Sequence, residues 1–164
     1  MNLPFARPGV VFDCNVTIQA IANKEGPSGQ SLSLLQSGSI TVFLSLAILR
    51  ELRETVNDPE LRARWSGLTD QVIDHFIQQL VFRAVLLRRV RHLMDYPRAT
   101  QDEPYLDAAW TADADFLVSR DKDLLALVTD HSIFGKDFRR HCPRLRIVDP
   151  VAFLLQMNQL KSQN

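Results

Sequence analysis

Residues 9–15 read Gly9-Val10-Val11-Phe12-Asp13-Cys14-Asn15. A short apolar run closed by a polar, turn-prone pair is typical of a buried parallel strand that carries a carboxylate to its C-terminal edge. Open α/β sheets build their functional sites along that edge. The pattern recurs downstream, where Phe116-Leu117-Val118-Ser119 is followed directly by Arg120-Asp121. Two strands that each end near an aspartate predict a carboxylate cluster, and such a cluster indicates a metal site.

Length and composition indicate one soluble domain. The 164 residues suit a single core, and the hydrophobic (46%) and charged (23%) fractions are ordinary for a globular protein. The net charge of zero argues against binding of nucleic acid through a global basic field, but it leaves room for a local basic stripe. Two cysteines cannot form a disulfide scaffold, and no Cys/His spacing resembles a zinc site. No signal peptide or membrane-spanning run is visible, so we expect a cytoplasmic protein.

The coarse pattern alternates strands with helices, which predicts a parallel sheet flanked by helices. We expect strands at 9–13, 40–44, 84–90, 115–119 and 144–148. Helices are expected at 15–23, from a cap at Ser28 or Ser31 to Gln36, at 46–56, from Pro59, at 69–80, at 104–112, at 122–128 and at 150–164. Residues 131–135 are expected to form a surface loop with one apolar anchor. The chain is predicted to be one domain over 1–164, with a core at about 9–150, an N-terminal extension at 1–8 and a C-terminal helix.

Four acidic residues fall where strand ends and helix starts should meet: Asp13, Glu51, Asp102 and Asp121. Carboxylates held close together repel one another unless a cation offsets their charge or some of them take up protons. Mg²⁺ and Mn²⁺ prefer such oxygen ligands. A metal between carboxylates can activate a water and stabilise the leaving oxygen of a phosphodiester.

Each acid also has a purely structural interpretation. Asp13 and Asp121 could be turn residues after strands, and Asp102 could be only a helix N-cap. Glu51 lies in Arg50-Glu51-Leu52-Arg53-Glu54, where a solvated helix face is the ordinary explanation. The hypothesis of a metal site depends on the order and placement of all four acids together.

The same segments resemble those of PIN domains. These segments are 11–16, 44–52, 102–106 and 114–125, and the last is the most specific. The chain is most similar to the bacterial and archaeal group described as toxins of type II toxin–antitoxin systems, over about residues 9–150. The resemblance implies a three-layer α/β/α sandwich and a Mg²⁺- or Mn²⁺-dependent ribonuclease. It also suggests an antitoxin partner and a homodimer.

Carried over by position, Asp13, Glu51 and Asp121 match the first, second and fourth family acids. Asp102 is the first choice for the third, with Glu103 and Asp107 as alternatives. Asp13, Asp102 and Asp121 would then bind the metal, while Glu51 would orient the attacking water or hold a second ion. Cleavage would leave a 5′-phosphate and a 3′-hydroxyl. The polar residues that would support the acids are Asn15, Ser119 and Asp123.

Other interpretations remain open. Two basic groups, at 83–98 and 139–146, could contact RNA phosphates or could be a solvated, ion-paired surface. Tyr96 or Tyr105 could stack on an unpaired base, although packing is the more ordinary role. A phosphatase that forms an aspartyl phosphate needs a second aspartate two residues after the first. This chain has Asn15 at that position, which argues against a phosphatase. A PIN-like module that binds RNA or a protein without cleaving it is the main alternative to a nuclease.

Overall fold

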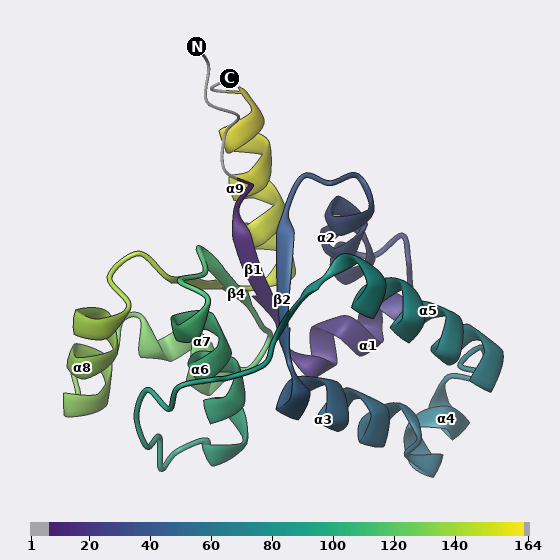
Figure 1. Ribbon diagram of the computed structural model, residues 1–164, viewed down its shortest axis with the longest axis horizontal. Helices are drawn as coiled ribbons and strands as arrows, with labels where there is room; N and C mark the ends of the chain where they lie inside the picture. The colour runs from purple at the N-terminus through teal and green to yellow at the C-terminus, as the bar shows by residue number, and fades with distance from the viewer. Residues whose placement is uncertain (1–6, 163–164) are drawn as a thin grey trace.

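A five-stranded parallel sheet forms the centre of the molecule (Figure 1). The computed structural model describes residues 7–162. The strand order is β3-β2-β1-β4-β5, and every neighbouring pair is parallel. This confirms the predicted sheet. The strands are β1 (Gly9–Phe12), β2 (Thr41–Ser45), β3 (Val85–Leu87), β4 (Phe116–Val118) and β5 (Arg146–Val148).

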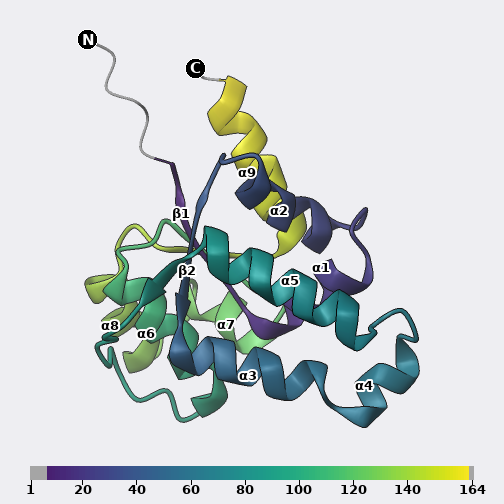
Figure 2. The same ribbon diagram turned by 45° about the vertical axis from the view of Figure 1, so that its right-hand side comes forward.

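Helices cover both faces of the sheet, as expected for a PIN-like α/β/α sandwich. One layer contains α6, α7 and α8, and the other contains α1, α2, α5 and α9 (Figures 1 and 2). The helices in the described part of the chain are α1 (Cys14–Ala22), α2 (Pro27–Gln36), α3 (Leu46–Val56), α4 (Pro59–Arg64), α5 (Asp70–Arg83), α6 (Glu103–Thr111), α7 (Lys122–Leu127), α8 (Ile133–His141) and α9 (Pro150–Ser162).

The central strands explain why the opening stretch of sequence is apolar throughout. Val10 and Val11 of β1 and Leu117 and Val118 of β4 are fully buried. A parallel strand with helices on both faces buries every side chain, so its sequence is continuously apolar rather than alternating. Each buried side chain of this size contributes about 1.5–3 kcal/mol to the free energy of unfolding. The strand ends are therefore held by the best-packed part of the core.

Several predicted boundaries were wrong. Strand β3 is only Val85–Leu87, because it is an exposed edge strand and arginines follow it directly. Strand β5 likewise starts at Arg146, two residues later than expected. Helix α2 begins at Pro27, so Ser28 and Ser31 lie inside it rather than capping it. Helix α1 begins at Cys14 because Asp13 is itself the N-cap residue.

The predicted loop at 131–135 is instead the start of helix α8. The Ser132 hydroxyl accepts a hydrogen bond from the Gly135 N–H and so caps the helix. A Cβ atom on Gly135 would lie only 2.2 Å from the Asp130 carbonyl oxygen, so glycine is needed there for the close approach of the backbone. Phe138 is the buried apolar anchor of this helix.

Two expectations concern the chain ends and the membrane. Most of the expected N-terminal extension lies outside the described residues, as do residues 163–164 of the expected last helix. Among residues 7–162, the structure contains no helix with the length and hydrophobicity needed to cross a bilayer.

Candidate active site

The ends of the two central strands, β1 and β4, define the position of the site. From β1 the chain continues to β2 on one side, while β4 pairs with β1 on the other, so the strand order reverses between them. Phe12 is in register with Val118, which places Asp13 beside Ser119. The Asp13 N–H extends the ladder by donating to the Val118 carbonyl at 3.0 Å. Ligands of open α/β sheets bind in the crevice at such a switch point.

Asp13 caps α1 with only one of its carboxylate oxygens. Its Oδ1 accepts a hydrogen bond from the Val16 N–H at 2.8 Å, and its Oδ2 accepts one from the Ser119 hydroxyl. The residue is 5% exposed. Burial raises the pKa of Asp13, although the hydrogen bonds from Ser119 and from the Val16 and Arg120 N–H groups oppose that rise. The cap therefore uses Oδ1 alone and leaves Oδ2 for a second role.

Asp121 has the same arrangement at the end of β4. Its Oδ1 accepts hydrogen bonds from the N–H groups of Asp123 and Leu124, at 2.7 and 3.3 Å, and thereby caps α7. The Asp121 N–H donates to Ser119 Oγ at 2.9 Å. The fully buried Ser119 hydroxyl therefore bridges the two aspartates.

We predict that Ser119→Ala slows any metal-dependent cleavage by about 10–100-fold, the usual effect of losing an outer-shell partner. The pH at which activity rises should also move upward, because the Ser119 hydrogen bond lowers the pKa of Asp13. A pH–rate profile measures both effects. Ser33→Ala, on the exposed face of α2, is the control. An unchanged profile in Ser119→Ala would contradict the bridging role.

Asp102 stands at the N-cap position of α6 but makes no capping hydrogen bond. The residue is 8% exposed, and in the described part of the chain its Oδ2 is buried without a hydrogen-bond partner. Burial raises the pKa of Asp102 from 3.8 to about 7, with further contributions from the charges of Asp121, Asp13, Glu51 and Asp123. An orphaned carboxylate oxygen among like charges fits a divalent cation, which would satisfy the oxygen and offset the charge.

The two alternatives for the third acid are occupied elsewhere. Glu103 Oε1 accepts a hydrogen bond from the Tyr96 N–H at 2.6 Å. Asp107 Oδ1 accepts one from the Leu93 N–H at 2.7 Å, and its Oδ2 lies 3.1 Å from His92 Nδ1. Both carboxylates thus hold the loop that precedes α6, so the structure favours Asp102 as the third acid.

Glu51, in the second turn of α3, is fixed by a tyrosine. Its Oε2 accepts a hydrogen bond from the Tyr105 hydroxyl at 2.7 Å, and that hydroxyl accepts one from the Cys14 N–H at 3.2 Å. Tyr105 is 2% exposed and Tyr96 is fully buried, so neither ring is available to stack on a base. The role of Tyr105 was not predicted, because its partner Glu51 lies 54 residues earlier in the chain, on a different helix.

Replacing Tyr105 by Phe is expected to reduce the free energy of unfolding by about 1–3 kcal/mol, because it leaves the Cys14 N–H without an acceptor. It should also slow cleavage by freeing Glu51. Urea unfolding and a cleavage assay measure the two effects. Tyr96→Phe removes the hydroxyl of the other buried tyrosine, which donates to the Asp123 carbonyl. Equal loss of cleavage in both variants would argue against a specific role for Tyr105.

Asp123 and Asn15, the remaining predicted residues, lie at the exposed edge of the site. Asp123 is exposed in the first turn of α7, close enough for its charge to raise the pKa of Asp102. Asn15 is exposed in the first turn of α1, and within residues 7–162 its side chain makes no hydrogen bond to the acids. Its predicted supporting role stays a prediction.

The four predicted acids are spread more widely than a closed ligand shell. Within the described part of the chain, the only three metal-ligating side chains with candidate atoms all within 4.8 Å are His92, Asp95 and Glu103. That group is largely exposed, and its members are engaged with Asp107 and with the Tyr96 N–H. Wider spacing at the strand ends is expected of carboxylates that repel one another.

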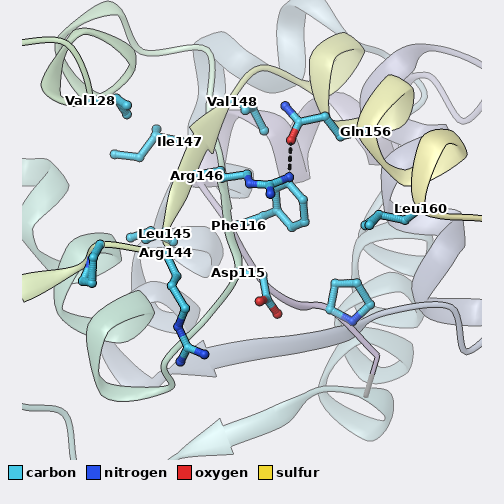
Figure 3. A pocket seen from close by; sticks show the side chains of 12 residues that line it. Asp115, Phe116, Val128, Arg144, Leu145, Arg146, Ile147, Val148, Gln156 and Leu160 are labelled. Carbon is cyan, nitrogen blue, oxygen red and sulfur yellow. Dashed lines mark hydrogen bonds between the residues drawn. The ribbon is translucent and has the colours of Figure 1, made fainter. Parts of the chain in front are cut away.

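Many of the basic side chains at 83–98 and 139–146 make contacts within the protein. The Arg91 guanidinium lies over the Trp110 ring, 4.2 Å from its centroid, and Arg144 pairs with Asp113. A cavity of about 770 Å³ lies along β5, where Arg146 donates to Gln156 (Figure 3). None of the four acids lines this cavity, so we do not place the site there.

Comparison with protein families agrees with this geometry. Residues 9–123 match the family described as PIN domain, which covers more than half of the chain. The protein belongs to the PIN domain family. The match ends short of the residue 150 expected from the sequence, so β5 and α9 lie outside the matched region. No curated protein and no solved structure matches the chain. PIN domains are generally metal-dependent nucleases, and the acids described above lie on the elements of such a nuclease fold.

Proposed function

We propose that this PIN-domain protein is an endoribonuclease that requires Mg²⁺ or Mn²⁺ and hydrolyses RNA phosphodiester bonds. The observation that carries this function is the Asp102 carboxylate, which is buried and has one oxygen without a partner among residues 7–162, while the charges of Asp13, Asp121 and Glu51 act on it. A bound divalent cation would explain that arrangement.

Asp13, Asp102 and Asp121 would hold the ion. When bound, the ion supplies charge stabilisation for the leaving oxygen and lowers the pKa of water. The protein itself holds the carboxylates of Asp13 and Glu51 in position. Ser119 fixes the carboxylate of Asp13, and Tyr105 fixes Glu51, whose free oxygen can accept a proton from the attacking water. Attack in line with the leaving 3′-oxygen gives a 5′-phosphate and a 3′-hydroxyl.

Cleavage of a mixed pool of structured RNAs with Mg²⁺, with Mn²⁺ and with EDTA tests this function. The native chain should cut with either metal and not with EDTA, and Asp121→Asn should lose cutting. The absence of both cutting and metal binding by calorimetry would favour the alternative, a PIN-like module that binds RNA or a protein without cleaving it.

We also propose that the protein is the toxin of a toxin–antitoxin pair. The similarity of residues 11–16 and 114–125 to such toxins supports this assignment. Induced expression of the native chain should then arrest growth, whereas Asp13→Asn at the same protein level should not. Growth arrest by both proteins would separate the toxicity from the acid cluster. A cognate antitoxin and a homodimer are the partners that we propose on the same grounds.

A further inference from the structure

A second cavity lies along α1 and reaches Arg120, the residue before Asp121. Its volume is about 340 Å³, at the lower end of the range for small-ligand pockets. The C-terminal half of α1, the start of α2, Trp65 and Arg120 line it. Arg120 follows Ser119 and precedes Asp121 in the chain, so this residue connects the cavity to the acid cluster.

Arg120 is the basic side chain in the lining of this cavity. Its side chain is exposed, and within residues 7–162 its guanidinium has no carboxylate partner within 4.0 Å. Arg98 and Arg144, by contrast, are paired with Asp130 and Asp113. A guanidinium without an internal partner at the wall of a cavity is available for bidentate binding of a phosphate.

Trp65 supplies an aromatic wall to the same cavity. It is half-buried at the C-terminal end of α4, where it packs against the hydrophobic core. Its backbone is fixed, since its N–H donates to the Leu61 carbonyl and its own carbonyl accepts from the Leu68 N–H. A rigid, partly exposed indole is a platform on which an unpaired base can stack.

Polar groups complete the wall. Gln19 and Asn23 lie one turn apart on α1, and the Ser28 hydroxyl donates to Gln19 Oε1 at 3.1 Å. These side chains can form hydrogen bonds to the edge of a base. Asn15 continues the same helix face towards Asp13. At 1.5 Å per residue, Asp13 and Gln19 are separated by about 9 Å along the helix axis, so a ligand here would lie next to the acids without touching them.

We infer, given the nuclease activity proposed above, that this cavity is a nucleotide subsite for single-stranded RNA. Trp65 stacks on the base, and Arg120 binds a phosphate adjacent to the one that is cut. The base must leave its duplex to enter the cavity, so the substrate is a loop, bulge or single-stranded end rather than a continuous helix.

Fluorescence of Trp65 tests the stacking directly. The chain has two tryptophans, so Trp110→Phe leaves Trp65 as the sole emitter. In an Asp13→Asn, Trp110→Phe protein, octauridylate should quench the emission, whereas an abasic ribose-phosphate octamer should not. Equal quenching by both, or by neither, overturns the base subsite. Because the Asp13→Asn substitution keeps both oligomers intact during the measurement, the result does not depend on whether the native chain is a nuclease.

Binding by the variants provides a second, separate readout. In the Asp13→Asn background, Trp65→Leu should weaken octauridylate binding about tenfold and leave abasic binding unchanged. Trp65→Phe retains a ring and should restore most of the affinity. Unchanged octauridylate affinity in Trp65→Leu contradicts the inference.

Arg120→Gln should weaken the binding of both oligomers. The slope of log K against log salt should become shallower by about 0.7, the contribution of one phosphate contact in a single strand. The control is Lys136→Gln, which also removes one positive charge, because Lys136 is exposed on α8, outside both basic groups and on the opposite side of the molecule from α1 and α4 (Figure 1). If the native chain and Arg120→Gln showed the same salt slope, Arg120 would not bind a phosphate. Failure of the native chain to cut any RNA would instead count against the nuclease function.

Discussion

Asp13→Asn is expected to slow RNA cleavage by at least about a thousandfold while the protein stays folded. A divalent ion contributes several kcal/mol to the stabilisation of a phosphoryl transition state, and each 1.36 kcal/mol is a factor of ten in rate. The carboxamide oxygen of Asn can still accept a hydrogen bond from the Val16 N–H and so cap α1, whereas its NH2 group replaces the oxygen that accepts from the Ser119 hydroxyl. It cannot supply the negative charge that holds the ion. Single-turnover cleavage with Mg²⁺, compared with the native chain, measures the effect.

The matched control is Asp74→Asn, because Asp74 is exposed on α5 and lies outside the acid cluster. This variant makes the same chemical change and should cut at the native rate. Circular dichroism should show that both variants are folded. Native-like cleavage by Asp13→Asn would remove this acid from the mechanism, and metal binding by the variant at native affinity would remove it from the ion site.

The stability of the metal-free protein is expected to fall as the pH rises from about 4 to about 7. Asp102 has a raised pKa, about 7 against 3.8, so in this window the folded protein holds a proton that the unfolded chain has released. Below pH 4 the carboxyl group is protonated in both states, and its contribution is fully present. The contribution is lost as the pH passes through the folded pKa. At 1.36 kcal/mol per unit, the loss is on the order of 4 kcal/mol. The raised pKa of Asp13 acts in the same direction.

Asp102→Asn should remove most of this pH dependence. The metal-free variant should be more stable than the native chain at pH 8 and similar to it at pH 4, as measured by urea unfolding. Asp74→Asn should keep the native profile. Added Mg²⁺ should stabilise the native chain more at pH 8 than at pH 5, since the ion competes with the proton. If the free energy of unfolding depended on pH in the same way for Asp102→Asn and the native chain, Asp102 would not be the acid whose raised pKa causes this dependence.

The part of the fold that the sequence predicted well is the buried part. Strands β1 and β4 read as continuous apolar runs because helices cover both of their faces, and their short length together with the polar residues that follow them favours a strand. The edge strand β3 has no such constraint, so its end could not be read from Val85 and the residues after it. Helix α8 was missed because Gly135 has low helix propensity, and only the contact with the Asp130 carbonyl explains it.

The residues of the candidate site also differ in how well the sequence predicts them. The positions of Asp13 and Asp121 at the strand ends could be predicted, because Asp13 follows β1 directly and Asp121 comes three residues after the end of β4. The choice among Asp102, Glu103 and Asp107 could not, since the three acids lie within about one helical turn and only their hydrogen-bond partners separate them. The link from Tyr105 to Glu51 joins two helices 54 residues apart in sequence, and no local pattern encodes it.

The Ser119 bridge also has a consequence for the timing of protein synthesis. It joins residues 106 positions apart, so a nascent chain that already contains Asp13 and Glu51 still lacks two of the four acids proposed for the site. Pairing of β1 with β4 closes a long loop and must await translation through residue 121. If the protein is the ribonuclease proposed above, it cannot attack the message and ribosome that are producing it until most of the polypeptide has emerged.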